Sequence, residues 1–267
     1  MEDLINKNMR IALAQTQIIW EKKEQNLAEA EKILRNCSAD EVDFVLFPEM
    51  SFTGFSMNTE LTTEDSGYTI KQVSEFAKVY NICIGFGWVK KLDRKNSNCY
   101  TIIDNTGKLL NTYAKIHPFS YSGEDKKFLS GDTITKFSIK NIVFTNFICY
   151  DLRFPELFRS VADEVHAIIV PACWPAKRSE HWKTLLRARA IENQVYIFAI
   201  NCSGNIGGLY YSGDSCVINP NGDAVEMLSD KEGVIIYDFK DDVIKYRKQF
   251  PVLNDRRNEL YKKITKT

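Results

Sequence analysis

Three phrases of the chain place a reactive side chain at or just beyond the end of a strand-like apolar run. Cys149 follows residues 142–148, Glu49 follows residues 44–48, and Lys115 follows residues 113–114. Side chains at strand ends lie at the rim of a sheet, where hydrolases often display a nucleophile. A thiol can attack a carbonyl carbon, a carboxylate can carry the proton, and an ammonium can hold an oxyanion. The three residues therefore predict a catalytic constellation in which Cys149 is the nucleophile.

Each of these residues also has an ordinary structural explanation. A buried cysteine is usually a small apolar side chain, and that is our prediction for the other six, at positions 37, 83, 99, 173, 202 and 216. Cys149 differs because Asp151, Arg153 and Glu156 follow it at once, which indicates an abrupt exit from the core. Taken alone, Glu49 could be a surface charge and Lys115 a solvated side chain.

Composition excludes several classes of partner. The chain has 267 residues, of which 44% are apolar and 26% charged, with 35 residues of each sign and no net charge. This balance gives no reason to expect nucleic acid or an anionic membrane as a partner. No apolar stretch approaches the roughly 20 residues that span a bilayer. The polar N-terminus is unlike a signal peptide. The cysteines are odd in number and scattered, which favours the reducing cytoplasm. The sequence leaves open whether the native chain starts at Met1 or at Met9.

The sequence gives no indication of a metal or a cofactor. The three histidines, at positions 117, 166 and 181, lack metal-ligand spacing, and no Cys-x-x-Cys pair is present. The glycines at 204, 207 and 208 do not form a phosphate-binding loop. We therefore expect chemistry performed by side chains alone.

Hydrophobic periodicity predicts strands that alternate with helices. The expected strands span 9–17, 43–47, 82–89, 99–104, 108–113, 133–138, 141–148, 165–170, 195–201 and 233–238. The expected helices span 22–36, 67–80, 155–163 and 178–193, and residues 114–132 read as a long polar loop. Turn residues at 105–107 and 219–222 predict hairpins. This order implies an α/β fold of mixed sheets with helices on the outer faces, in a single domain over 1–267.

The three phrases together resemble the nitrilase (carbon–nitrogen hydrolase) superfamily, whose signature is a Glu, a Lys and a Cys in that order. The matching phrases are Phe-Pro-Glu at 47–49, Lys-Ile-His at 115–117 and Cys-Tyr-Asp-Leu-Arg-Phe-Pro-Glu at 149–156, and the resemblance extends from 10–15 to 213–220. It implies a four-layer αββα sandwich that pairs into a homodimer. Residues 174–182 and 187–194 look most like the omega-amidase branch.

The resemblance implies an amidase that hydrolyses the terminal amide of 2-oxoglutaramate or 2-oxosuccinamate and releases ammonia. Cys149 would form a thioester, with Glu49 as the base and proton donor. Lys115 and the backbone N–H of Tyr150 would hold the oxyanion. Glu124, nine positions after Lys115, matches a second glutamate of the family that supports the lysine and orients substrate.

The residues that could contact the substrate each have two interpretations. Arg153 could bind a substrate carboxylate in bidentate fashion, or could pair with Asp151 or Glu156 to fix the turn. Trp174, Phe55 and Phe119 could line the pocket or simply pack. We expect the 178–193 helix residues His181, Arg187, Arg189 and Glu192 to be structural or interfacial, and His117 to brace its loop.

Other functions stay open at this stage. Within the superfamily, an amidase acting on deaminated glutathione shares the phrase that begins at Cys149, and other aliphatic amidases or a nitrilase are further alternatives. From a different class, the chain could be a non-catalytic binding module on the same scaffold. A redox or metal-binding cysteine protein is less favoured, because the cysteines are not paired in sequence.

Overall fold

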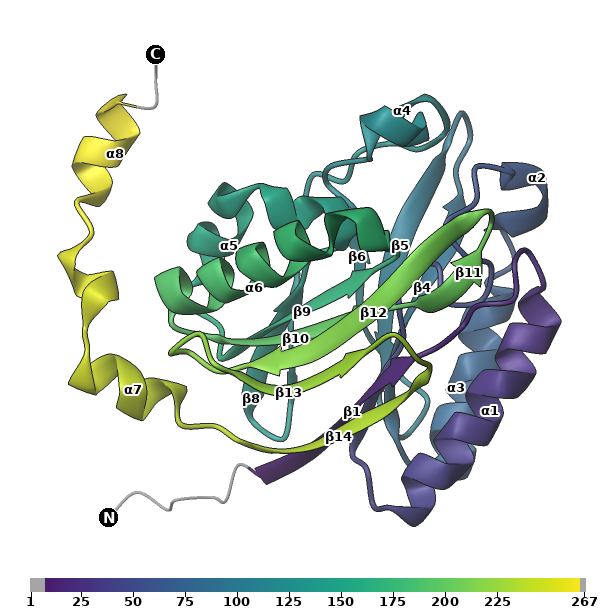
Figure 1. Cartoon of the computed structure of the whole chain (residues 1–267), viewed down its shortest axis with the longest axis horizontal. Coiled ribbons are helices and arrows are strands. Elements are labelled where there is room, and N and C mark those ends of the chain that lie inside the picture. The colour runs from purple at the N-terminus through teal and green to yellow at the C-terminus, as the bar shows by residue number, and fades with distance from the viewer. Residues whose placement is uncertain (1–7, 265–267) are drawn as a thin grey trace.

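Two mixed β-sheets face each other, and helices cover their outer sides (Figure 1). The computed structural model describes residues 8–264. The first sheet has the order β14-β1-β2-β4-β5-β6, with β3 paired to β4. Its strands are β1 (Asn8–Gln15), β2 (Phe44–Leu46), β3 (Thr63–Glu64), β4 (Cys83–Lys91), β5 (Asn96–Ile103), β6 (Leu109–Ala114) and β14 (Gly233–Lys240).

The second sheet has the order β11-β12-β10-β9-β8-β7, with β13 paired to β12. Its strands are β7 (Lys136–Ile139), β8 (Ile142–Asn146), β9 (Ala167–Ala172), β10 (Tyr196–Asn201), β11 (Ser203–Ile206), β12 (Leu209–Ile218) and β13 (Ala224–Ser229). In each sheet, three central strands pair in parallel and the flanking strands pair antiparallel, except that the two-residue β3 pairs parallel with β4.

The alternation of side chains in β1 shows how the layers are assembled. Ile11 and Leu13 belong to the core between the two sheets, whereas Ala12 and Ala14 face the helices. Successive side chains of a strand point to opposite faces, so a strand that is apolar at every position is buried on both sides. The small alanines let the outer helices pack closely on this sheet.

The helices lie where the predicted αββα sandwich requires them, so that prediction is confirmed. α1 (Lys23–Ala39) and α3 (Tyr68–Tyr80) pack on the first sheet, and α5 (Pro155–Val161) and α6 (Ser179–Asn193) pack on the second. α1 buries Leu27, Ala30, Leu34 and Cys37, a helical spacing that places all four on the sheet side. The short helices are α2 (Thr59–Thr62), α4 (Glu124–Lys127), α7 (Val243–Gln249) and α8 (Asn258–Ile264).

The C-terminal residues leave the body of the fold. α7, the turn η4 (Val252–Asp255) and α8 run as an arm beside the sandwich, drawn in yellow in Figure 1. Every described residue of α8 is exposed. Within residues 8–264, none of the helices combines the length and apolar character needed to cross a bilayer.

The structure differs from the predicted elements in a few places. The segment 114–132 is not only loop, since it contains the turn η1 (Ser120–Ser122) and α4. The helix predicted over 22–36 continues to Ala39, and the strands β3 and β11 were not predicted. Of the two alternative start residues, Met1 lies outside the described residues, and Met9 is the second residue of β1.

Candidate active site

Glu49, Lys115 and Cys149 lie just beyond the ends of β2, β6 and β8 and meet between the two sheets. Lys115 Nζ lies 2.7 Å from Glu49 Oε1. The side chains of both residues are almost completely excluded from solvent. Cys149 is half-buried, and its Sγ lies 4.0 Å from the carbonyl oxygen of Cys173, the residue whose backbone N–H binds Glu49. The structure therefore brings together the three residues that the sequence singled out.

Glu124 joins this cluster from α4. Its carboxylate oxygens lie 2.9 Å and 3.2 Å from Lys115 Nζ, and one of them also accepts a hydrogen bond from the backbone N–H of Phe119. Glu124 is fully buried, whereas the neighbouring Asp125 is exposed. Two carboxyl groups thus share one ammonium.

Glu49 is held at both carboxylate oxygens. Oε1 accepts hydrogen bonds from Lys115 Nζ and, at 2.8 Å, from Asn98 Nδ2. Oε2 accepts a 3.0 Å hydrogen bond from the backbone N–H of Cys173, which follows β9. The loop that carries Glu49 is fastened to β4, because Ser51 Oγ accepts from the N–H of Gly87 and Ser51 N–H donates to the Gly87 carbonyl.

The buried charges shift the pKa values of the nucleophile and the lysine. Burial, and then the negative charge of Glu49, raise the pKa of the Cys149 thiol well above its usual value, although Lys115 opposes this. Burial alone would lower the pKa of Lys115, but Glu124 and Glu49 together raise it well above its usual value. At neutral pH the resting site therefore contains a neutral thiol and a charged ammonium.

Cys149 starts the 3-10 turn η2 (Cys149–Arg153) in a left-handed conformation, with φ of 47°. This conformation is strained for a residue with a side chain, and it reverses the chain sharply after β8. The first N–H groups of such a turn have no acceptor within the turn, so they can face negative charge in the cavity.

Asp151, a residue of η2, holds this turn in place through its side chain. Its buried carboxylate accepts hydrogen bonds from Tyr113 Oη at 2.8 Å, from the Ile148 N–H at 3.0 Å and from the His117 N–H at 2.9 Å. His117 Nδ1 also lies 2.9 Å from the same carboxylate, and its ring stacks on Phe154. His117 therefore braces the lysine loop, as predicted.

Arg189 of α6 also supports η2. Its guanidinium donates two hydrogen bonds to the Leu152 carbonyl, at 2.7 Å and 3.2 Å, and it pairs with Glu192. Arg189 and Glu192 therefore make structural contacts, as expected for this helix. Arg187 is exposed on the same helix.

A cavity of about 280 Å³ opens beside Cys149. It is lined by all five predicted substrate-contact residues, namely Phe55, Phe119, Tyr150, Arg153 and Trp174, together with Met57, Tyr121, Pro175, Leu209 and Tyr211. The apolar and aromatic walls suit the chain of a small organic substrate. Lys115 also lines this cavity, and its Nζ lies 5.2 Å from the centre of the Phe55 ring.

Three cationic side chains besides Lys115 line the cavity. Arg153, Lys177 and Arg178 line it, and none of the lining residues in the described chain is acidic. Arg153 stacks over Trp174 at 4.7 Å and lies 3.4 Å from His181 Nδ1, and Arg178 stacks over Phe119 and Tyr121. Within residues 8–264, no ion pair joins Arg153 to Asp151 or Glu156, so the alternative that Arg153 fixes the turn by such a pair is wrong.

Burial lowers the pKa of Arg153, and the nearby charge of Arg178 lowers it further, although Tyr150 opposes this. The two guanidinium groups therefore repel each other across the cavity. An anion bound between them would relieve that repulsion.

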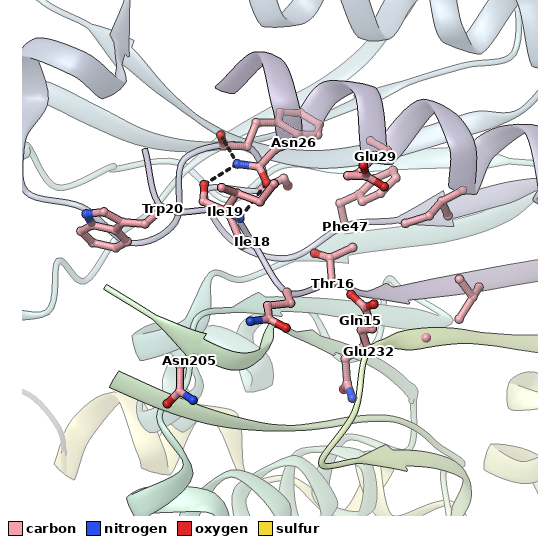
Figure 2. Close-up of a pocket in the computed structure, with 17 residues that line it drawn as sticks. Gln15, Thr16, Ile18, Ile19, Trp20, Asn26, Glu29, Phe47, Asn205 and Glu232 are labelled. Carbon is pink, nitrogen blue, oxygen red and sulfur yellow. Dashed lines mark hydrogen bonds between the residues drawn. The ribbon is translucent and has the colours of Figure 1, made fainter. Parts of the chain in front are cut away.

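A larger hollow, of about 800 Å³, lies elsewhere, between α1 and the turn that joins β13 to β14 (Figure 2). Asn26 stands at its edge with its amide already bound to backbone groups of Ile19 and Phe52. None of Glu49, Lys115, Glu124 and Cys149 lines this hollow. The candidate site is therefore the smaller cavity.

Several residues of the site were not found by sequence reasoning. Asn98 is the third residue of β5, and its contacts depend on strand register rather than on a local motif. The Cys173 N–H is a backbone group, which leaves no trace in side-chain patterns. Lys177 and Arg178 were visible only as part of a longer polar phrase after Trp174.

Comparisons with known proteins agree with this geometry. A sequence profile described as carbon-nitrogen hydrolase matches residues 10–248. The chain is 31% identical over 262 residues to "Hydrolase in agr operon" of Staphylococcus aureus, covering 95% of this chain and 100% of that protein. It is 31% identical over 258 residues to a 2-oxoglutaramate amidase of Bacillus subtilis, covering 94% and 98%.

A solved structure is similar over nearly the whole chain. XC1258 from Xanthomonas campestris, described as a CN-hydrolase superfamily protein with an arsenic adduct in the active site, matches with a TM-score of 0.88 and 27% identity. The match covers 93% of this chain and 97% of that one.

Proposed function

The chain belongs to the carbon–nitrogen hydrolase family and is a cysteine-dependent amidase, and from that premise we propose that it hydrolyses the omega-amide of a small 2-oxo dicarboxylic acid. The favoured substrates are 2-oxoglutaramate and 2-oxosuccinamate. We assign the nucleophile to Cys149, the proton transfers to Glu49 and the support of Lys115 to Glu124.

The attack on the amide needs help from Glu49. Because the pKa of Cys149 is raised, the thiol carries its proton at neutral pH and must lose it as sulfur attacks. The Glu49 carboxylate, whose negative charge helps to raise the pKa of that thiol, takes the proton. Lys115 has three N–H donors, of which two are used by Glu49 and Glu124, so one is left for the carbonyl oxygen. The Tyr150 N–H supplies the second oxyanion contact.

The intermediate then collapses in the direction of ammonia release. The C–N bond breaks as Glu49 returns its proton to the leaving nitrogen, which leaves a thioester on Cys149. Glu49 next takes a proton from water as the water oxygen attacks the thioester carbon. When the C–S bond breaks, the proton goes to the Cys149 sulfur, and the carboxylic acid leaves. Each residue ends the cycle in its starting state.

The substrate proposal depends on one observation, the acid-free cavity lined by Arg153, Lys177 and Arg178. A substrate with a carboxylate at the end opposite its amide would place that carboxylate among these cations while the amide reaches Cys149. The volume of about 280 Å³ suits a compact substrate. The name of the Bacillus subtilis relative is consistent with this chemistry.

The test is ammonia release from 2-oxoglutaramate by the wild-type protein and by Cys149→Ala. Deaminated glutathione, a neutral aliphatic amide and an aliphatic nitrile should be assayed in parallel. Turnover of 2-oxoglutaramate that disappears in the variant would support both the nucleophile and the substrate. Turnover of only another compound through Cys149 would overturn the substrate. Turnover of none would favour the non-catalytic scaffold. Cys37→Ala, a change at a buried cysteine of α1, is the matched control.

Three further expectations stand beside this proposal. We propose that residues 1–267 form one domain, that the protein is a homodimer, and that it works in the cytoplasm. Light scattering coupled to size-exclusion chromatography would measure the oligomeric state. A monomer at assay concentrations would overturn the dimer.

A further inference from the structure

Asn98 is a buried residue of β5 that bridges the two carboxylates of the site. Its Nδ2 donates to Glu49 Oε1 at 2.8 Å and to Glu124 Oε1 at 2.9 Å. Its backbone carbonyl accepts a 2.9 Å hydrogen bond from the N–H of Lys115. One residue therefore contacts all three members of the charged cluster, although it does not line the substrate cavity.

The orientation of the Asn98 amide follows from electrostatics. The opposite orientation would place the amide oxygen against two carboxylates, which cannot donate hydrogen bonds while ionised. With the nitrogen on that side, the buried Oδ1 has no hydrogen-bond partner among the described residues. Leaving a buried acceptor unpaired costs stability, so ordinary packing does not explain an asparagine here.

The bridge determines which oxygen of Glu49 is available for chemistry. Asn98 Nδ2 and Lys115 Nζ both bind Oε1, which turns Oε2 toward the backbone N–H of Cys173. Cys173 is also the residue whose carbonyl oxygen lies 4.0 Å from Cys149 Sγ. A neutral donor shared by two carboxylates also holds them near each other despite their repulsion. Without it, Glu49 could rotate away from the thiol.

We propose that Asn98 is a positioning residue of the amidase reaction, which fixes Glu49 in the orientation that accepts the Cys149 proton. This inference rests on the role of Glu49 in the proposed function but not on the identity of the substrate. Because Asn98 does not touch the cavity, its loss should lower kcat and leave KM nearly unchanged.

The test compares Asn98→Asp and Asn98→Leu with the wild-type protein. Both variants remove the two donors at similar volume, and kcat should fall by roughly 100-fold or more with KM changed by less than about threefold. In Asn98→Asp the introduced carboxyl can donate a hydrogen bond only when protonated. Burial beside the carboxylates of Glu49 and Glu124 raises the pKa of such a carboxyl above its usual value of about 3.9, so the activity of Asn98→Asp relative to wild type should rise as the pH is lowered from about 8 to about 5.5.

The matched control is Asn111→Leu. Asn111 is a buried asparagine of β6 whose Nδ2 donates to Asn146 Oδ1 at 3.2 Å, away from the charged cluster. It should lose stability without losing kcat per folded molecule. If the Asn98 variants lose activity only in proportion to the folded fraction, or if the Asn98→Asp ratio is flat with pH, Asn98 is merely structural.

Alkylation of Cys149 by iodoacetamide, followed by mass spectrometry, gives a readout that needs no substrate. Each Asn98 variant should react roughly tenfold or more slowly than Asn111→Leu, because the base is misplaced. Equal rates would overturn the inference. Failure of the wild-type protein to release ammonia from any amide would count against the proposed function instead, and the alkylation rates would still decide the role of Asn98.

Discussion

Tyr113 donates a hydrogen bond of 2.8 Å to Asp151, and this contact ties the strand that precedes the lysine to the turn that carries the nucleophile. Burial and then the charge of Asp151 raise the pKa of the Tyr113 hydroxyl far above its usual value, so it stays a donor at any working pH. Lys115 follows β6 of the first sheet, and Cys149 follows β8 of the second sheet. The Tyr113–Asp151 contact therefore sets the spacing of Lys115 and Cys149 across the sandwich.

Tyr113→Phe should destabilise the protein by about 1–3 kcal/mol, because it removes one of the donors to a buried carboxylate. We expect a smaller effect on kcat, since the Ile148 and His117 contacts keep the turn in place. Thermal unfolding and steady-state kinetics would measure both. Tyr210→Phe, a change at an exposed tyrosine that bonds Asp230, should leave both quantities almost unchanged.

Lys115→Met should reduce kcat by about 100- to 1,000-fold, the usual cost of losing an oxyanion donor. It also leaves two buried carboxylates without a cation, so we expect the free energy of unfolding to fall by about 3–5 kcal/mol. The control is Lys78→Met, which breaks an exposed pair with Glu75. A Lys115 variant with normal stability would mean that the charged cluster is not paired as described.

Arg153→Met and Arg178→Met should each raise KM for 2-oxoglutaramate by about 10- to 100-fold, because each removes a charge-assisted hydrogen bond to the carboxylate. The KM for a neutral amide of similar length should stay the same. Arg187→Met, which changes an exposed arginine outside the cavity, is the control. Equal losses on charged and neutral amides would argue against a carboxylate site.

Stability should decline on the alkaline side more steeply in wild-type protein than in Cys149→Ala. The folded pKa of Cys149 is raised by burial and by Glu49, whereas an unfolded thiol ionises near about 8.5. Above that pH the folded state still holds a proton that the unfolded state has released. The contribution of this group is therefore complete below the unfolded pKa and is lost as the pH rises. Thermal melts between about pH 7.5 and 10 would measure it, and parallel curves would contradict it.

Gly87→Ala should impair the Glu49 loop. A Cβ at Gly87 would lie 2.3 Å from the Met50 nitrogen and 3.0 Å from Glu49 Cα, and both of these are backbone atoms. We expect a loss of about 1–3 kcal/mol in stability and a fall of roughly tenfold or more in kcat per folded molecule. Gly85→Ala is the matched change on the same strand, where a Cβ meets the side chain of Leu46 at 2.8 Å. Its kcat should fall much less.

The fold was predictable because its strands and helices follow clear hydrophobic periods. The alternation of Ile11 and Leu13 with Ala12 and Ala14 is visible in the sequence and corresponds to the two faces of β1. The turn after Cys149 was also predictable, since polar residues follow an apolar run directly. β11 was missed because it is only four residues long and contains a glycine.

The parts of the site that escaped prediction depend on contacts between distant segments. Asn98 reaches Glu49 only because β5 pairs with both β4 and β6, a register that a single sequence does not specify. Likewise, Arg153 was weighed against pairing with Asp151, but Asp151 is already occupied by Tyr113 and His117. Competition for a buried partner becomes visible only when the whole set of donors is known.

The backbone of Cys149 limits how stable an active form of this enzyme can be. With φ at 47°, any side chain at this position costs about 1–2 kcal/mol, and only glycine adopts the conformation freely. Selection for thermal stability alone would therefore favour glycine at the one position where the thiol is needed. Rigidity and reactivity compete at a single residue, so a more heat-resistant amidase must gain its stability from parts of the sandwich remote from this turn.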